Sequence, residues 1–179
     1  MNPETVPVLT FVGLSGTGKT TFLEKLIPEL KGRGLRLAVL KHDAHQFEVD
    51  KPGKDTWRFT QAGADVVAIS NQEKFAMIER TPRQLTLAEL IGRLPDVDLV
   101  LTEGYKRSQV KKIELHRSVL GNPIISRPEE LLAILTDEPL DLPVTQLDLT
   151  DVTGCANLIL TWMQAETASR SAPAAQIRI

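Results

Sequence analysis

Residues 13–20 read Gly-Leu-Ser-Gly-Thr-Gly-Lys-Thr and match the pattern G-x-x-x-x-G-K-[ST]. Glycines at this density let the backbone adopt conformations that a Cβ would forbid and let it approach a ligand closely. Consecutive N–H groups in such a loop point at phosphate oxygens, and a helix beginning there adds the positive end of its dipole. The stretch therefore predicts a P-loop, the phosphate-binding loop of α/β proteins.

The residues on both sides of this stretch are those that a P-loop requires. Residues 7–12 form a short apolar, β-prone run, as expected for a strand buried on both faces. After the stretch, apolar residues repeat at helical spacing over residues 22–30. Because the pattern follows a strand and opens a helix, we favour a ligand-binding loop over a glycine-rich turn without a ligand. Lys19 is then expected to reach the β- and γ-phosphates, and the Thr20 hydroxyl to help hold Mg²⁺.

A second informative stretch is Asp-Leu-Val-Leu-Thr-Glu-Gly at residues 98–104, where an apolar strand delivers Glu103 at its carboxyl end. A strand that delivers an acid at its carboxyl end is typical of the Walker-B element of P-loop proteins. Ligands of such sheets bind beyond the carboxyl ends of the strands. Glu103 is therefore predicted either to bind Mg²⁺ through water or to orient an attacking water.

Residues 41–45 read Lys-His-Asp-Ala-His and end another predicted strand, so they are expected near the phosphates. Three interpretations are open. Asp43 binds Mg²⁺ indirectly through its waters, or His42 and His45 form a transition-metal site with Asp43, or the loop is simply solvated. We favour the first, because Mg²⁺ takes oxygen ligands and this spacing is weak evidence for a transition metal.

Asp137 follows the predicted buried strand 131–135. In many guanine-nucleotide proteins an aspartate near this place accepts hydrogen bonds from the guanine N1–H and amino group, which makes Asp137 the candidate for the base. A standard N-K-x-D sequence is absent, so motif alone does not decide between guanine and adenine.

Length and composition bound the class of protein. The 179 residues, of which 42% are hydrophobic, suffice for one domain, predicted over residues 1–165 with a loose tail over 166–179. A net charge of −2 without a dense basic block argues against nucleic-acid binding. Cys155 is the one cysteine, which fits a reducing cytoplasm. No apolar run approaches the ~20 residues of a membrane span and the start is unlike a signal peptide, so we expect a cytoplasmic protein.

Other short motifs occur along the chain in a recognisable order: Asp-Lys-Pro-Gly-Lys-Asp at 50–55, Thr-Glu-Gly-Tyr-Lys at 102–106, Arg-Pro-Glu-Glu-Leu at 127–131 and Thr-Asp-Glu-Pro at 136–139. With the P-loop they resemble the molybdopterin-guanine dinucleotide biosynthesis adaptor family, MobB, over residues 7–165. The resemblance implies an α/β, three-layer P-loop NTPase fold. Its sheet would be mostly parallel, with an added antiparallel β segment used in dimerisation.

Two β-prone runs in the middle of the chain fit the added segment. Residues 64–70 and 74–79 are joined by the tight connection Asn71-Gln72-Glu73. Together with the other predicted strands of the chain, they predict a four-stranded parallel core with an antiparallel addition.

The same resemblance implies a function. The chain would be a homodimeric GTP-binding adaptor with weak Mg²⁺-dependent GTPase activity. It would assist a MobA-type molybdopterin guanylyltransferase in joining GMP to molybdopterin, and it would also interact with molybdopterin-handling proteins. The expected ligands are GTP and Mg²⁺, with Lys19 and Glu103 as catalytic residues. Thr20, Asp43 and Glu103 are expected on the metal side. The residues expected to bind the nucleotide are Gly13, Ser15, Gly16, Thr17, Gly18, Lys19, Thr20, Thr21 and Asp137.

A P-loop small-molecule kinase is the alternative from another class. Such enzymes usually close an arginine-bearing lid over the phosphates, whereas the arginines of the middle region are scattered: Arg58, Arg80, Arg83 and Arg93. No arginine finger is evident, so hydrolysis is expected to be slow unless a second copy supplies Arg107 or Arg117. We therefore favour the adaptor over the kinase. A pure binding module, which binds GTP without hydrolysing it, is a third hypothesis close to the adaptor.

Overall fold

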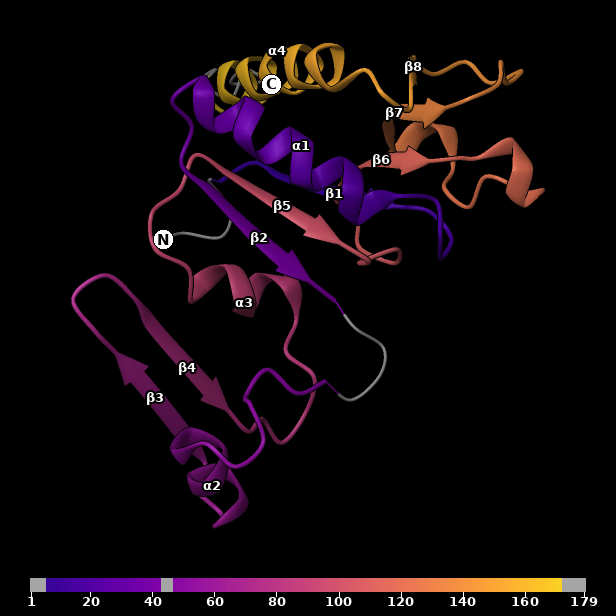
Figure 1. The fold of residues 1–179 in the computed structure, drawn as a ribbon. Helices are drawn as coiled ribbons and strands as arrows, with labels where there is room; N and C mark the ends of the chain where they lie inside the picture. The colour runs from indigo at the N-terminus through magenta and orange to yellow at the C-terminus, as the bar shows by residue number, and fades with distance from the viewer. Residues whose placement is uncertain (1–5, 43–46, 172–179) are drawn as a thin grey trace, which may run out of the picture. The chain divides into compact units, whose positions relative to one another are not determined.

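The computed structural model describes residues 6–42 and 47–171 (Figure 1). The chain divides into two compact units, one of residues 1–42 with 91–179 and the other of residues 43–90. Asp43 and His45, which were predicted near the metal, lie outside the described residues.

The first unit is built on a six-stranded sheet in the order β2-β5-β1-β6-β7-β8 (Figure 1). All its neighbouring strands pair in parallel, as predicted for a mostly parallel α/β sheet. The strands are β1 (Val8–Val12), β2 (Leu37–Lys41), β5 (Leu99–Glu103), β6 (Lys111–Leu115), β7 (Leu131–Thr136) and β8 (Gln146–Asp148). The predicted core of four strands was too small, because β6 and the short β8 also join in parallel register.

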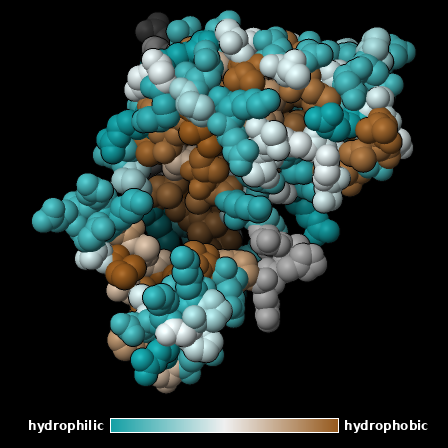
Figure 2. All heavy atoms as spheres, in the orientation of Figure 1, coloured by the Kyte–Doolittle hydropathy of each residue, from teal (hydrophilic) through white to brown (hydrophobic). Residues whose placement is uncertain are grey.

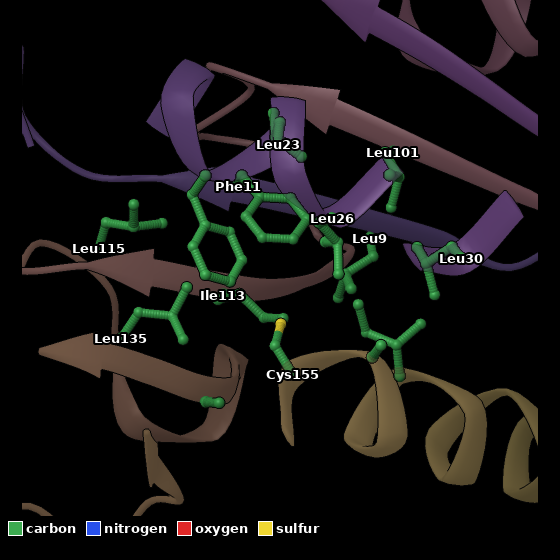
Figure 3. Close-up of a cluster of buried hydrophobic side chains, with 14 of the residues drawn as sticks. Leu9, Phe11, Leu23, Leu26, Leu30, Leu101, Ile113, Leu115, Leu135 and Cys155 are labelled. Carbon is green, nitrogen blue, oxygen red and sulfur yellow. The ribbon is translucent and has the colours of Figure 1, made fainter. Parts of the chain in front are cut away.

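Two helices cover one face of this sheet. Helices α1 (Lys19–Gly32) and α4 (Val152–Ser171) both bury side chains against β1, β5, β6 and β7 (Figure 3). Phe11 of β1 and Phe22 of α1 meet at the centre, with ring centroids 6.2 Å apart. Cys155 of α4 is fully buried in the same core. The packing fixes α1, and with it the loop that precedes α1, against the central strand.

The last helix is longer than predicted. It continues to Ser171, so residues 166–171 are helical, although they were predicted to belong to a loose tail. Residues 172–179 lie outside the described residues. The helices within the described ranges all fall short of the length and apolar character that a membrane span requires.

The second unit contains the predicted antiparallel segment. Strands β3 (Val66–Ser70) and β4 (Phe75–Glu79) form a hairpin that is a sheet of its own, after the short helix α2 (Asp55–Gln61). Four large apolar side chains of the hairpin are more than half exposed: Val66, Ile69, Phe75 and Met77. Figure 2 shows apolar residues among hydrophilic ones on the surface of this unit. Helix α3 (Leu87–Gly92) then leads back to the first unit.

The connection from β6 to β7 contains two 3-10 turns, η1 (Ser118–Leu120) and η2 (Pro128–Glu130). The second of these turns places Glu130 beside a buried cation. The Lys112 side chain is 3% exposed, and its Nζ lies 3.0 Å from Glu130 Oε1. The backbone N–H of Arg127 and the Lys112 ammonium lower the pKa of Glu130 to about 2.

Glu130→Ala is expected to destabilise the protein by about 3 kcal/mol, because it leaves the Lys112 ammonium buried without a carboxylate. Urea unfolding measures the loss. Glu129→Ala is the matched control, since Glu129 and Arg127 form an exposed pair that contributes at most about 1 kcal/mol. Because the pKa of Glu130 is lower in the folded state than in the unfolded state, its contribution is complete above about pH 4.5 and declines toward pH 2. Equal losses for the two variants would contradict this account of Lys112.

Candidate nucleotide-binding site

The glycine loop, residues 13–20, leaves the carboxyl end of β1 and runs into α1. This is the strand, loop and helix order that the sequence predicted. Gly13, Gly16 and Gly18 have φ of 138°, 83° and 95°, a region that side chains with a Cβ rarely adopt. Gly18 is the N-cap of α1 and no side chain caps it. The first turn of α1 therefore has backbone N–H groups available for an anion.

Lys19 folds back on this loop. Its Nζ donates to Gly13 O at 3.1 Å and to Leu14 O at 2.9 Å. Partial burial lowers the pKa of Lys19, nearby Lys106 and Lys41 lower it further, and Glu103 opposes the shift. A partly desolvated ammonium with cationic neighbours favours the arrival of an anion.

Thr20 and Glu103 meet beside the loop. The Thr20 hydroxyl lies 3.2 Å from both carboxylate oxygens of Glu103, to which it can donate. Glu103 ends β5, and its Cα pairs with Phe11 of the parallel strand β1. Strand pairing thus brings together two of the predicted metal ligands, 83 residues apart. Their donors are oxygens, which are the ligands that Mg²⁺ prefers.

The loop after β2 approaches the same place through its backbone. His42 N donates to Glu103 O at 2.9 Å, and the His42 ring lies 5.0 Å from that of Tyr105. Gly104 has φ of 103°, and a Cβ there would lie 2.8 Å from His42 O. Among residues 6–42 and 47–171, no group of three or more His, Cys, Asp or Glu side chains could hold a metal ion. The transition-metal interpretation depends on Asp43 and His45 and stays a prediction, as does the role of Asp43 with Mg²⁺.

Asp137 follows β7 at the same edge of the sheet and is exposed. Ser118 N donates to its Oδ1 at 2.8 Å. This hydrogen bond is the main cause that lowers the pKa of Asp137, and Arg117 adds a smaller electrostatic effect. The side chain is therefore an anion at neutral pH.

Three other residues predicted to bind the nucleotide lie on the loop or in the first turn of α1. Thr17 is buried, and its hydroxyl donates to Leu14 O at 2.9 Å. Ser15 and Thr21 are exposed, Ser15 on the loop and Thr21 in the first turn of α1.

Two residues that follow β6 make contacts that the sequence did not predict. Arg117 Nε donates to Thr17 O at 2.9 Å, across 100 residues of chain. His116 is buried, and its Nε2 lies 2.8 Å from Glu138 Oε1. Both residues follow β6, which pairs in parallel with β1. Their position after the carboxyl end of a predicted strand was the one sequence signal that could have placed them near the glycine loop.

A parallel sheet with a glycine loop between its central strand and a covering helix defines an α/β protein, a class whose ligands bind at the carboxyl ends of the strands. Comparisons with known proteins narrow this class. A model of the family "Molybdopterin guanine dinucleotide synthesis protein B", MobB, matches residues 8–137. The chain therefore belongs to the MobB family.

Two relatives named molybdopterin-guanine dinucleotide biosynthesis adapter protein are similar over most of their length. That of Haemophilus influenzae is 41% identical over 160 residues, which cover 88% of this chain and 90% of the relative. The Escherichia coli relative is 42% identical over 171 residues, which cover 90% of this chain and 95% of the relative.

Solved structures agree with the fold. A crystal structure of molybdopterin-guanine biosynthesis protein B superposes with a TM-score of 0.66 at 30% identity, covering 87% of this chain and 99% of the other. The crystal structure of Bacillus subtilis MobB superposes with the same TM-score and identity, covering 87% of this chain and 96% of the other. The expected fold class is thus confirmed.

Proposed function

We propose that this chain is a GTP-binding adaptor that assists the attachment of GMP to molybdopterin. Membership of the MobB family and the names of the two relatives support the adaptor role. The observation that supports the nucleotide part most strongly is the meeting of Thr20 and Glu103 beside Lys19, at the mouth of the glycine loop. The proposed partner is a MobA-type guanylyltransferase, together with proteins that handle molybdopterin.

In this proposal the glycine loop wraps the phosphates of GTP. The backbone N–H groups of residues 13–18 donate to phosphate oxygens, and Lys19 leaves the carbonyls of Gly13 and Leu14 to reach the terminal phosphates. The side chains of Ser15, Thr20 and Thr21 lie at the exposed side of the loop, where an anion would enter.

Thr20 and Glu103 are proposed to hold Mg²⁺, directly or through water. A bound Mg²⁺ would neutralise phosphate charge as the terminal phosphoryl group leaves. Lys19 would stabilise the same charge, and Glu103 would orient the attacking water. Hydrolysis would be slow because the Nε of Arg117 is already bound to the carbonyl of Thr17, and no other arginine is proposed to reach the terminal phosphate.

The exposed hairpin β3–β4 is the proposed contact between two copies of the chain. An isolated two-stranded hairpin is marginally stable in water, and contiguous exposed apolar side chains usually mark an interaction site. A second copy that covered Val66, Phe75 and Met77 would supply the missing burial.

Asp137→Asn is expected to lower the preference for GTP over ATP by at least about tenfold. The asparagine oxygen can still accept the N–H of Ser118, so the turn keeps its shape. The amide nitrogen, however, donates where guanine also donates, which removes a charge-assisted hydrogen bond of roughly 1.5–3 kcal/mol. Competition titrations with GTP and ATP measure the ratio. An unchanged ratio would exclude Asp137 from base recognition.

The reaction is tested with GTP labelled on the γ-phosphate, in the presence of Mg²⁺ and with or without candidate acceptors. Label appearing slowly in free phosphate supports the GTPase adaptor. Label appearing in an acceptor would refute it in favour of a kinase. Wild type and Glu103→Gln are compared in parallel, so that a contaminating hydrolase is recognised by equal rates in both.

A further inference from the structure

Residues 116–118, which follow β6, connect the two halves of the proposed site. On one side Arg117 Nε donates to Thr17 O of the glycine loop at 2.9 Å. On the other side Ser118 N donates to Asp137 Oδ1, and His116 Nε2 pairs with Glu138 Oε1, both at 2.8 Å. Three consecutive residues thus hold the loop proposed for phosphate and the aspartate proposed for the base.

The contact with Thr17 indicates on which side of the loop the guanidinium lies. In a trans peptide the C=O and the following N–H point in opposite directions. Arg117 binds the carbonyl of the Thr17–Gly18 peptide, so the N–H of Gly18 points away from the guanidinium. If that N–H faces a phosphate, Arg117 lies outside the phosphate cradle and cannot act on the γ-phosphate.

The outer part of the guanidinium is available for another contact. Nε is used by Thr17 O, whereas Nη1 and Nη2 have no hydrogen bond among those found in the described part of the chain. Nη2 lies beside Gly18, 3.3 Å from the position of a Cβ there. The side chain is half-buried, and it is close enough to Asp137 to lower the pKa of that carboxyl.

We propose that Arg117 is a nucleotide-positioning residue that contacts the nucleoside part of the bound nucleotide. This inference rests on the proposed function. A nucleotide with its phosphates in the glycine loop and its base at Asp137 must span the distance between them, and Arg117 lies on that path. A guanidinium suits this place, because its flat face stacks on an aromatic base while its edge donates to ribose oxygens.

The test measures the binding of GTP, GDP and inorganic tripolyphosphate to full-length wild type, Arg117→Ala and Arg117→Lys. Arg117→Ala should weaken GTP and GDP by the same factor, at least about tenfold. Tripolyphosphate, which has no nucleoside, should lose no more than about threefold. Arg117→Lys should recover little of the loss, since an ammonium lacks the planar fork.

Arg36→Ala is the control for the loss of one positive charge, because Arg36 is exposed and precedes β2 at the opposite end of the strands. It should bind all three ligands as wild type does. Unchanged GTP affinity in Arg117→Ala would overturn the inference. An equal loss for GTP and tripolyphosphate would also overturn it, since Arg117 would then only shape the loop. If wild type binds no GTP, the proposed function itself fails.

Discussion

Lys19→Ala is expected to abolish measurable GTP binding while the protein remains folded. Lys19 is proposed to reach the terminal phosphates, where a charge-assisted hydrogen bond contributes roughly 1.5–3 kcal/mol. Losing two such bonds reduces affinity by at least about a hundredfold. The fold should be retained, because Lys19 is only half-buried and contacts the carbonyls of its own loop.

Calorimetric titration with GTP and Mg²⁺ measures the effect, and thermal unfolding verifies the fold. Lys25→Ala is the matched control, since Lys25 lies on the same helix and is exposed. A variant Lys19→Ala that titrates normally would remove Lys19 from the site.

Gly13→Ala should produce the largest loss of stability among changes in the glycine loop. A Cβ at Gly13 would lie 2.6 Å from Leu115 O and 3.0 Å from Thr17 Oγ1, and its φ is 138°. The first of these atoms belongs to the backbone of β6, which pairs with β1. The clash is relieved only by moving the loop or the strand, so we expect a loss of about 3 kcal/mol or more.

Gly16→Ala is the control that separates the effect of the steric clash at Gly13 from the effect of backbone strain. Gly16 also has a positive φ, of 83°, but a Cβ there would meet no atom within 4 Å. Strain alone should cost about 1–2 kcal/mol. Urea unfolding of both variants gives the comparison, and GTP affinity should fall further in Gly13→Ala. Equal unfolding free energies would show that the contact with Leu115 is unimportant.

The parts of the site that local sequence determines were predictable. The glycine loop has an unusual composition and fixed spacing, and it lies between a strand and a helix as expected. Glu103 could be predicted because it ends an apolar strand, and parallel strands end at one edge of the sheet. Its contact with Thr20 follows from these two facts.

Contacts that depend on strand order could not be predicted in the same way. The bond from Arg117 to Thr17 joins residues 100 apart and requires β6 to lie next to β1. No local pattern distinguishes this order from others. His116 alternates like a surface residue in sequence, yet the turn after β7 brings Glu138 over it. The end of α4 was missed for another reason, since Ala, Ser and Thr composition suggested a tail where Ala favours a helix.

A crystal structure of the full chain with a non-hydrolysable GTP analogue and Mg²⁺ tests the central claim most directly. We predict the triphosphate inside residues 13–20, with Lys19 on the terminal phosphates and Mg²⁺ beside Thr20 and Glu103. A nucleotide bound elsewhere, with the glycine loop empty, would contradict the account.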